Sequence, residues 1–186
     1  LTEMFTVEKV HSSPARFDMK KLEAINGDKI RALTLDEFLK WSLPFLTKAD
    51  VITGTDAEIE LVKKALPIIQ ERIIMLSEVP AMLKFLFVKN FAVEADSVAK
   101  ITDDASKQVL ERSLKELELL ATWTHESIEA ALRSSLIEEM GLKPRIAFGA
   151  VRIATTGSTI SPPLFESMEL LGKEASLARI RAGIKL

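Results

Sequence analysis

The chain has 186 residues and a formal net charge of −2, so it is long enough to bury a core, and its overall charge does not indicate nucleic-acid binding. It contains no cysteine, which excludes disulfides, thiolate metal sites and cysteine nucleophiles and fits a reducing cytoplasm. No apolar run approaches the roughly 20 residues that span a bilayer, and no signal peptide is visible. Because the first residue is Leu1 and not methionine, we interpret the chain as a piece of a larger protein.

Charge is divided unevenly along the chain. The residues from 141 onward include seven Lys or Arg and three Glu, whereas residues 94–140 include five Lys or Arg and eleven Asp or Glu. This division favours a molecule whose basic end approaches an anion while its acidic part stays solvated.

Helical signals begin at Asp18, which can cap a first helix that we expect to end at Asn26-Gly27. Thr34 and Glu37 then form a capping box before "LDEFLKWSLPFL". Both features predict helix starts from residue types alone.

A second capping box, Thr55 with Glu58, precedes the helical run "AEIELVKKALPIIQERIIML". Pro67 falls inside this run, so it marks either a kink or the start of a new helix. The segment "VPAMLKFLF" that follows predicts a short and very apolar helix.

The second half of the chain carries three more helical patterns. Within residues 103–121, apolar residues recur at helical spacing: Leu110, Leu114, Leu117 and Ala121. Thr124 can cap a helix that ends at Gly141, and Pro144 can open another that ends at Gly157.

These patterns predict an all-α fold. Strand alternation is absent except around "VEKVHSS" at residues 7–13. We expect a helical bundle or cage in two subdomains, preceded by a short helical segment. The internal joint is predicted at 88–96, where the apolar helix stops and the acidic region begins.

Motifs for catalysis and metal binding are missing. The two histidines are His11 and His125, and no second histidine accompanies "HESIE" to complete a zinc helix. No glycine-rich phosphate loop is present. The carboxylate pairs Asp103-Asp104 and Glu138-Glu139 are interpreted as solvated faces. We therefore predict no catalytic residue and no metal ligand, and we expect a binding module.

The stretch "TTGSTISPPLFESMELLGKE", residues 155–174, predicts a rigid loop that leads into an amphipathic helix. Ser161 is a candidate N-cap, with Pro162 and Pro163 in the first helical positions, where no N–H is needed. The helix is expected to end at Gly172 and to bury a stripe of Leu164, Met168 and Leu171. Two interpretations remain open: a well-capped helical corner, or a preformed contact site that loses little entropy on binding.

Three segments resemble bacterial glutamyl-tRNA synthetases, which are class I aminoacyl-tRNA synthetases. "VRIATTGSTISPPLFESMELLGKEASLARI" resembles the closing motif of that family, and "SSPARFDMKKLEAINGDKIRAL" is similar to the segment after its KMSKS loop. "LPIIQERIIMLSEVPAMLKFLF" is similar to its first anticodon-domain helices. The chain departs from the family at "NGDKIR", where an aromatic residue or His-Ile usually occupies Lys29-Ile30.

The resemblance implies three parts: residues 1–36 end the stem-contact domain, and residues 37–94 and 95–186 form two helical anticodon-binding subdomains. The family's HIGH-like and KMSKS-like ATP-binding motifs belong upstream, so this piece should be inactive alone and need no cofactor. The parent protein is expected to ligate glutamate to tRNA with ATP and Mg²⁺. It should act in the cytoplasm as a monomer, with glutamate tRNA as partner and neither DNA nor membrane.

The resemblance also implies roles for single residues. Arg72, in the helical run "QERIIML", matches the arginine that reads the last anticodon base and so separates glutamate tRNA from glutamine tRNA. A planar guanidinium suits a base edge. Arg152 matches an arginine beside the anticodon. Ser161, Pro162 and Leu164 match loop positions that contact the other two anticodon bases.

Lys20, Lys21 and Arg31 are candidates for contacts with backbone phosphate near the tRNA corner, although they are equally well explained as ordinary helix charges. The main alternative for the whole chain is a helical protein-interaction adaptor without RNA binding. A small helical enzyme is the weaker alternative, because the sequence offers no nucleophile–base pair and no metal cluster.

Overall fold

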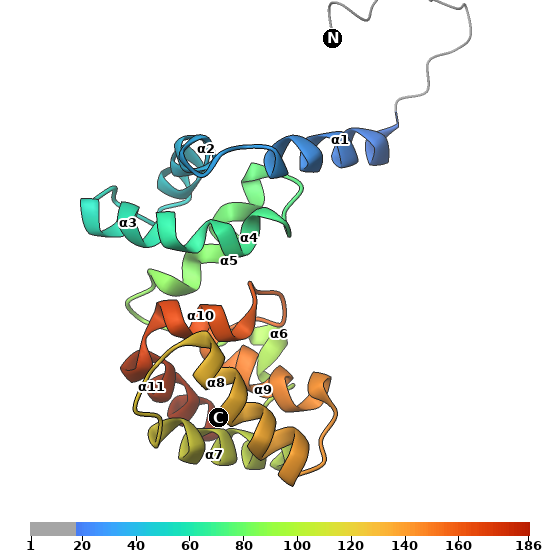
Figure 1. Cartoon of the computed structure of the whole chain (residues 1–186), viewed down its shortest axis with the longest axis vertical. Helices are drawn as coiled ribbons and strands as arrows, with labels where there is room; N and C mark the ends of the chain where they lie inside the picture. The colour runs from blue at the N-terminus through green and yellow to red at the C-terminus, as the bar shows by residue number, and fades with distance from the viewer. Residues whose placement is uncertain (1–17) are drawn as a thin grey trace, which may run out of the picture.

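The computed structural model describes residues 18–186, and every regular element in that range is helical (Figure 1). The first part contains α1 (Met19–Arg31), α2 (Leu35–Lys48), α3 (Asp56–Ala65), α4 (Pro67–Gln70), η3 (Leu76–Glu78), α5 (Val79–Leu83) and η4 (Lys84–Leu86). The second part contains α6 (Ala95–Val98), α7 (Asp104–Glu118), α8 (His125–Leu132), η5 (Arg133–Glu139), α9 (Pro144–Thr156), α10 (Leu164–Leu171) and α11 (Lys173–Ile184). The predicted all-α class is confirmed, while the segment "VEKVHSS" lies outside the described residues.

Capping hydrogen bonds confirm most predicted helix starts. The Asp18 carboxylate accepts a backbone hydrogen bond from the first turn of α1. Thr34 with Glu37, and Thr55 with Glu58, form complete capping boxes at α2 and α3. Local residue chemistry therefore decides where these helices begin.

Helix α1 continues through Asn26 and Gly27 to Arg31, so the end predicted at Asn26-Gly27 was wrong. The Asn26 side-chain amide donates to the carbonyl oxygen of Ile74. A Cβ on Gly27 would lie 3.2 Å from the Ile74 side chain, so only glycine allows this approach without displacement. Contacts with a distant segment carry the helix past a residue of low helix propensity.

Other boundaries follow the predictions with two refinements. Of the two alternatives for Pro67, the structure has the start of a new helix, α4. The helix capped by Thr124 continues from α8 into a π-helix, η5, before Gly141 at φ 67°. Helix α9 begins at Pro144 and ends before Gly157 at φ 86°, as predicted.

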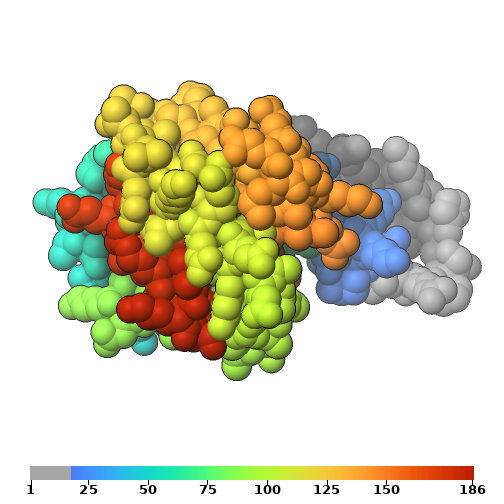
Figure 2. All heavy atoms as spheres, turned by 90° about the horizontal axis from the view of Figure 1, so that it is seen from below, coloured from blue at the N-terminus to red at the C-terminus, as the bar shows by residue number. Residues whose placement is uncertain are grey.

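The buried apolar residues form two cores, one above the other in Figure 1. The largest fully buried side chains of the first core, within α2–α5 and the turns between them, are Phe38, Leu46, Leu66, Ile69, Ile73 and Leu83. Those of the second core include Leu110, Leu117, Ile128, Leu132 and Leu136. Figure 2 shows the underside of the second part, where α11 (red) lies beside α7 (yellow-green).

The two parts are joined by α10 and by a buried arginine. Leu170 of α10 packs against the first core, whereas Leu164, Phe165 and Met168 of the same helix pack in the second. Arg179 of α11 is 9% exposed and donates to the carbonyl oxygens of Thr155 (2.7 Å) and Phe85 (2.8 Å). Its guanidinium lies 3.9 Å from the centre of the Phe91 ring. Burial lowers the pKa of Arg179 to about 10, so it remains protonated at neutral pH.

Helices α8 and α10 are linked by a charged pair. Nδ1 of His125, the first residue of α8, lies 2.8 Å from Oε2 of Glu169 in α10. Its Nε2 lies 3.2 Å from a carboxylate oxygen of Glu126. The hydrogen bond with Glu169 raises the pKa of His125, and the charges of Glu126, Glu169 and Glu166 add to that effect.

His125→Gln should lower the melting temperature more at about pH 5 than at about pH 9. Because folding raises the pKa of His125, the contribution of the protonated ring is fully present below its unfolded pKa of about 6.5. It is lost as the pH rises through the folded pKa. Melting curves of both proteins across this range measure the difference, with Glu169→Gln as a second variant that removes the partner charge. An equal deficit at both pH values would show that the charge interaction contributes nothing.

Candidate nucleic-acid interface

The loop between α9 and α10, residues 157–163, is fixed where it leaves α9. Gly157 adopts a positive φ that favours glycine, and its carbonyl oxygen accepts a hydrogen bond from the backbone N–H of Glu94 (2.9 Å). A Cβ at Gly157 would lie 3.2 Å from the carbonyl oxygen of Ala92. The start of the loop therefore packs closely on the segment that joins the two parts.

Arg152 braces the loop from the side of α9. Its Nη1 donates to Oγ of Ser161 (2.6 Å) and to the carbonyl oxygen of Pro162 (2.7 Å). Burial lowers the pKa of Arg152, and the nearby charge of Arg72 lowers it further, whereas Glu166 raises it. One guanidinium nitrogen thus holds two consecutive loop residues in place.

Ser161 is not the N-cap that we predicted, and α10 begins at Leu164. Ser161 and Pro162 each precede a proline, which disfavours the helical conformation at both positions. The residue at the cap position is Pro163, with ψ 135° and no side-chain capping bond. The Ser161 hydroxyl is used by Arg152 instead.

Exposure divides the loop residues into two groups. Pro162 is buried and Leu164 is 3% exposed within the second core, so neither offers a large side-chain surface. A contact at Leu164 would have to use its backbone N–H, which lies in the first turn of α10 and has no intrahelical partner. Thr159 and Ile160 are exposed, Ile160 at 75%. We did not predict these two residues, although an isoleucine inside a polar loop was a usable signal.

Arg72 lies on a turn after α4 and not on a helix, contrary to our expectation. The turn is nevertheless fixed, because Ile73 is buried in the first core. The Glu78 carboxylate also accepts hydrogen bonds from the backbone N–H groups of Ile74 (3.1 Å) and Met75 (2.7 Å). Arg72 is exposed, and its charge acts on Arg152, whose pKa it lowers in addition to the effect of burial.

The three candidates for backbone contacts all lie on α1. Lys20 and Lys21 are exposed near the start of this helix, which is the end that points away from the two cores in Figure 1. Arg31 lies at its other end and pairs with Asp28 at 2.6 Å. Lys20 and Lys21 are therefore separate from the loop and from Arg72, and all three roles stay predictions.

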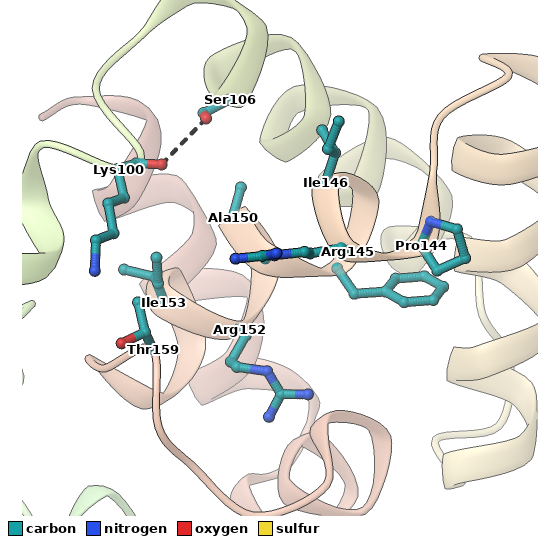
Figure 3. Close-up of a pocket in the computed structure, with 11 residues that line it drawn as sticks. Lys100, Ser106, Pro144, Arg145, Ile146, Ala150, Arg152, Ile153 and Thr159 are labelled. Atoms are coloured by element: carbon teal, nitrogen blue, oxygen red, sulfur yellow. Dashed lines mark hydrogen bonds between the residues drawn. The ribbon is translucent and has the colours of Figure 1, made fainter.

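Two hollows flank the loop. The first, of about 680 Å³, is lined by Lys100, Ser106, Thr159 and residues of α9 that include Arg145, Phe148 and Arg152 (Figure 3). The second, of about 410 Å³, is lined by Met82, Phe85, Thr156, Ser158, Ile160 and Ser161, together with Glu78, Lys84 and Glu94. Thr159 lies in the wall of one hollow and Ile160 in the wall of the next, so the loop separates them.

Within residues 18–186, no group of three or more His, Cys, Asp or Glu side chains is arranged to hold a metal ion. None of the helices in this range is long and apolar enough to cross a membrane.

A family model described as the anticodon binding domain matches residues 33–184. The chain belongs to this family. The matched range contains Arg72, Arg152 and the whole loop, whereas Lys20, Lys21 and Arg31 precede it. Membership of the anticodon binding domain family favours the RNA-binding interpretation over the helical adaptor.

Curated relatives agree with this assignment. A glutamate–tRNA ligase of Saccharopolyspora erythraea is 46% identical over 185 residues, which cover 98% of this chain and 37% of the relative. A glutamate–tRNA ligase of an Arthrobacter species is 48% identical over 185 residues, with the same shares covered. The chain therefore spans little more than a third of the length of these relatives.

Two solved structures share the fold. A glutamate tRNA ligase from Elizabethkingia meningosepticum, in complex with its amino acid, superposes with a TM-score of 0.75 at 20% identity, covering 97% of this chain and 35% of that one. A glutamate–tRNA synthetase from Elizabethkingia anophelis gives a TM-score of 0.73 at 21% identity, covering 98% and 34%. The all-α arrangement of this anticodon binding domain thus recurs in experimental structures.

Proposed function

We propose that the chain is the tRNA-recognition portion of a glutamyl-tRNA synthetase and binds the anticodon of glutamate tRNA. The observation that carries the proposal is the braced loop at residues 157–163 beside Arg72, within the range matched by the anticodon binding domain family. The ligase relatives support the choice of glutamate tRNA.

The chemistry of the loop suits unstacked bases. Such bases bind to apolar surface and to hydrogen-bonding groups held in fixed positions. The loop offers the exposed side chain of Ile160 and the hydroxyl of Thr159, and Arg72 adds a planar set of donors. Because Arg152 already orders the loop, little conformational entropy is lost on binding.

The proposal assigns residues 1–36 to the end of a stem-contact domain, and 37–94 and 95–186 to two anticodon-binding subdomains. The remaining part of the parent protein would bind ATP with Mg²⁺ and ligate glutamate to the tRNA. No residue of this chain is assigned to ATP or to the metal. The parent is proposed to act in the cytoplasm as a monomer, and the chain alone should not aminoacylate tRNA.

Filter binding with the purified chain tests this function. The RNAs are a glutamate tRNA transcript and a transcript whose three anticodon bases alone are replaced. We expect the replacement to abolish specific binding. Between about 50 and 200 mM salt, log K for the first transcript should fall with a slope of about −0.7 to −0.9 per phosphate contact. Equal affinity for the two transcripts would contradict the proposal.

A further inference from the structure

We infer that the first hollow, beside α9, is a subsite for a phosphodiester of the RNA strand that carries the recognised bases. This inference rests on the proposed function. The hollow lies between the segment before α7, which supplies Lys100, and α9, which supplies Arg145 (Figure 3). It shares Arg152 and Thr159 with the loop region, so a strand that crosses the loop enters it directly.

The charges that line the first hollow favour an anion. Lys100 and Arg145 both line it, and neither forms an ion pair with any residue of 18–186. None of the described residues that line it is Asp or Glu. In Figure 3, the side chain of Arg145 extends toward the side on which Lys100 lies, whereas the side chain of Arg152 points away from Lys100. Two cations in a concave wall raise the local concentration of a polyanion.

The second hollow is lined by acidic and apolar side chains, in contrast to the first. Glu78 and Glu94 line it, and its lysine, Lys84, is already paired with Glu94 at 2.6 Å. Met82 and Phe85 add apolar surface. Phosphate is repelled here, whereas the face of a base is not. The strand is therefore oriented across the loop, with its backbone toward α9 and a base toward the second hollow.

The size of the first hollow fits one unit of the RNA backbone. A volume of about 680 Å³ exceeds one phosphate and admits the adjoining ribose. Gly149 of α9 lines this hollow, and a Cβ placed on it would meet no atom within 4 Å. A larger side chain at Gly149 would thus project into open space, and replacing glycine within a helix does not weaken the helix.

Three variants separate this subsite from general electrostatics. Lys100→Gln with Arg145→Gln removes the two cations, and Gly149→Leu places an apolar side chain in the hollow and narrows it without changing charge. Lys48→Gln with Lys185→Gln is the matched control, because both lysines are exposed and line neither hollow. Circular dichroism melting of each variant verifies that it is folded.

The probe is a hairpin with the sequence of the anticodon arm of glutamate tRNA, titrated by fluorescence anisotropy at several salt concentrations. We expect both the double glutamine variant and Gly149→Leu to lose at least about tenfold in affinity at low salt. In both variants the slope of log K against log salt concentration should also become shallower by about 0.7 to 1.8, the value for one or two phosphate contacts. The control should change affinity by less than about twofold, as expected if its lysines contact no phosphate. If Gly149→Leu binds like the control, no part of the RNA occupies the hollow and the inference is wrong.

Hairpins with one neutral methylphosphonate linkage at successive positions locate the phosphate. At one position, the neutral linkage should weaken binding to the wild type but not to the double glutamine variant, because the two changes remove one interaction. Additive losses at every position would overturn the inference while leaving anticodon discrimination, and so the proposed function, intact. Failure of the wild type to bind any hairpin would instead defeat both. Inorganic phosphate that competes as strongly as the hairpin would assign the hollow to a free anion and overturn the RNA subsite.

Discussion

Arg179→Met should destabilise the chain by about 3 kcal/mol, because each buried carbonyl left without a donor costs about 1–3 kcal/mol. Methionine keeps an unbranched apolar stem but donates no hydrogen bond to Thr155 or Phe85. The stacking of the guanidinium on Phe91 is lost as well. Urea unfolding of the wild type and the variant measures the difference in free energy.

Arg181→Met is the control for this change, since Arg181 lies on the same helix. Its side chain is exposed and pairs with Glu118, and an exposed ion pair contributes about 0–1 kcal/mol. Arg179→Met should also weaken RNA binding, because Arg179 connects η4 of the first part to the end of α9, from which the loop departs. Equal destabilisation by the two variants would show that Arg179 does not hold the parts together.

Residue types predicted the helix starts well because an N-cap is decided within about four residues. Thr34, Thr55 and Thr124 cap their helices through side chains only three residues from their partners. The end of α1 was mispredicted because Asn26 contacts Ile74, 48 positions away. A contact between segments so far apart has no local signature in the sequence.

The same reasoning explains what could be predicted of the candidate site. The two prolines predicted a rigid loop. The hydrogen bond from Arg152 to Ser161 was not predicted, because the two residues are nine positions apart in the sequence. Lys100 was overlooked because it lies in the acidic segment 94–140, whose net charge points away from RNA. Folding places this lysine in the wall of the same hollow as Arg145 of α9. Segment charge is an average, and an electrostatic site depends on which members of the segment share a surface.

Arg72→Gln should reduce discrimination at the last anticodon base by about 1–3 kcal/mol, by analogy with a lost bidentate contact to a base. The fold should survive, because the Arg72 side chain is exposed. The hydrogen bond to the carbonyl oxygen of Ile69 (2.9 Å) comes from the backbone N–H of Arg72, which the substitution keeps. The measurement is the ratio of dissociation constants for two anticodon hairpins that differ in that base alone. An unchanged ratio would show that Arg72 is an ordinary surface charge.

Arg152→Gln is the comparison variant for this ratio of dissociation constants. Arg152 fixes the loop, so its loss should weaken both hairpins by a similar factor, since the loop must then be ordered during association. The Arg72 variant should change the ratio and the Arg152 variant the overall affinity. Because the two arginines are close enough to interact, the double variant should deviate from additivity. If Arg152→Gln alters the ratio as much as Arg72→Gln does, Arg152 reads a base as well as bracing the loop, and the two roles are not divided between these residues.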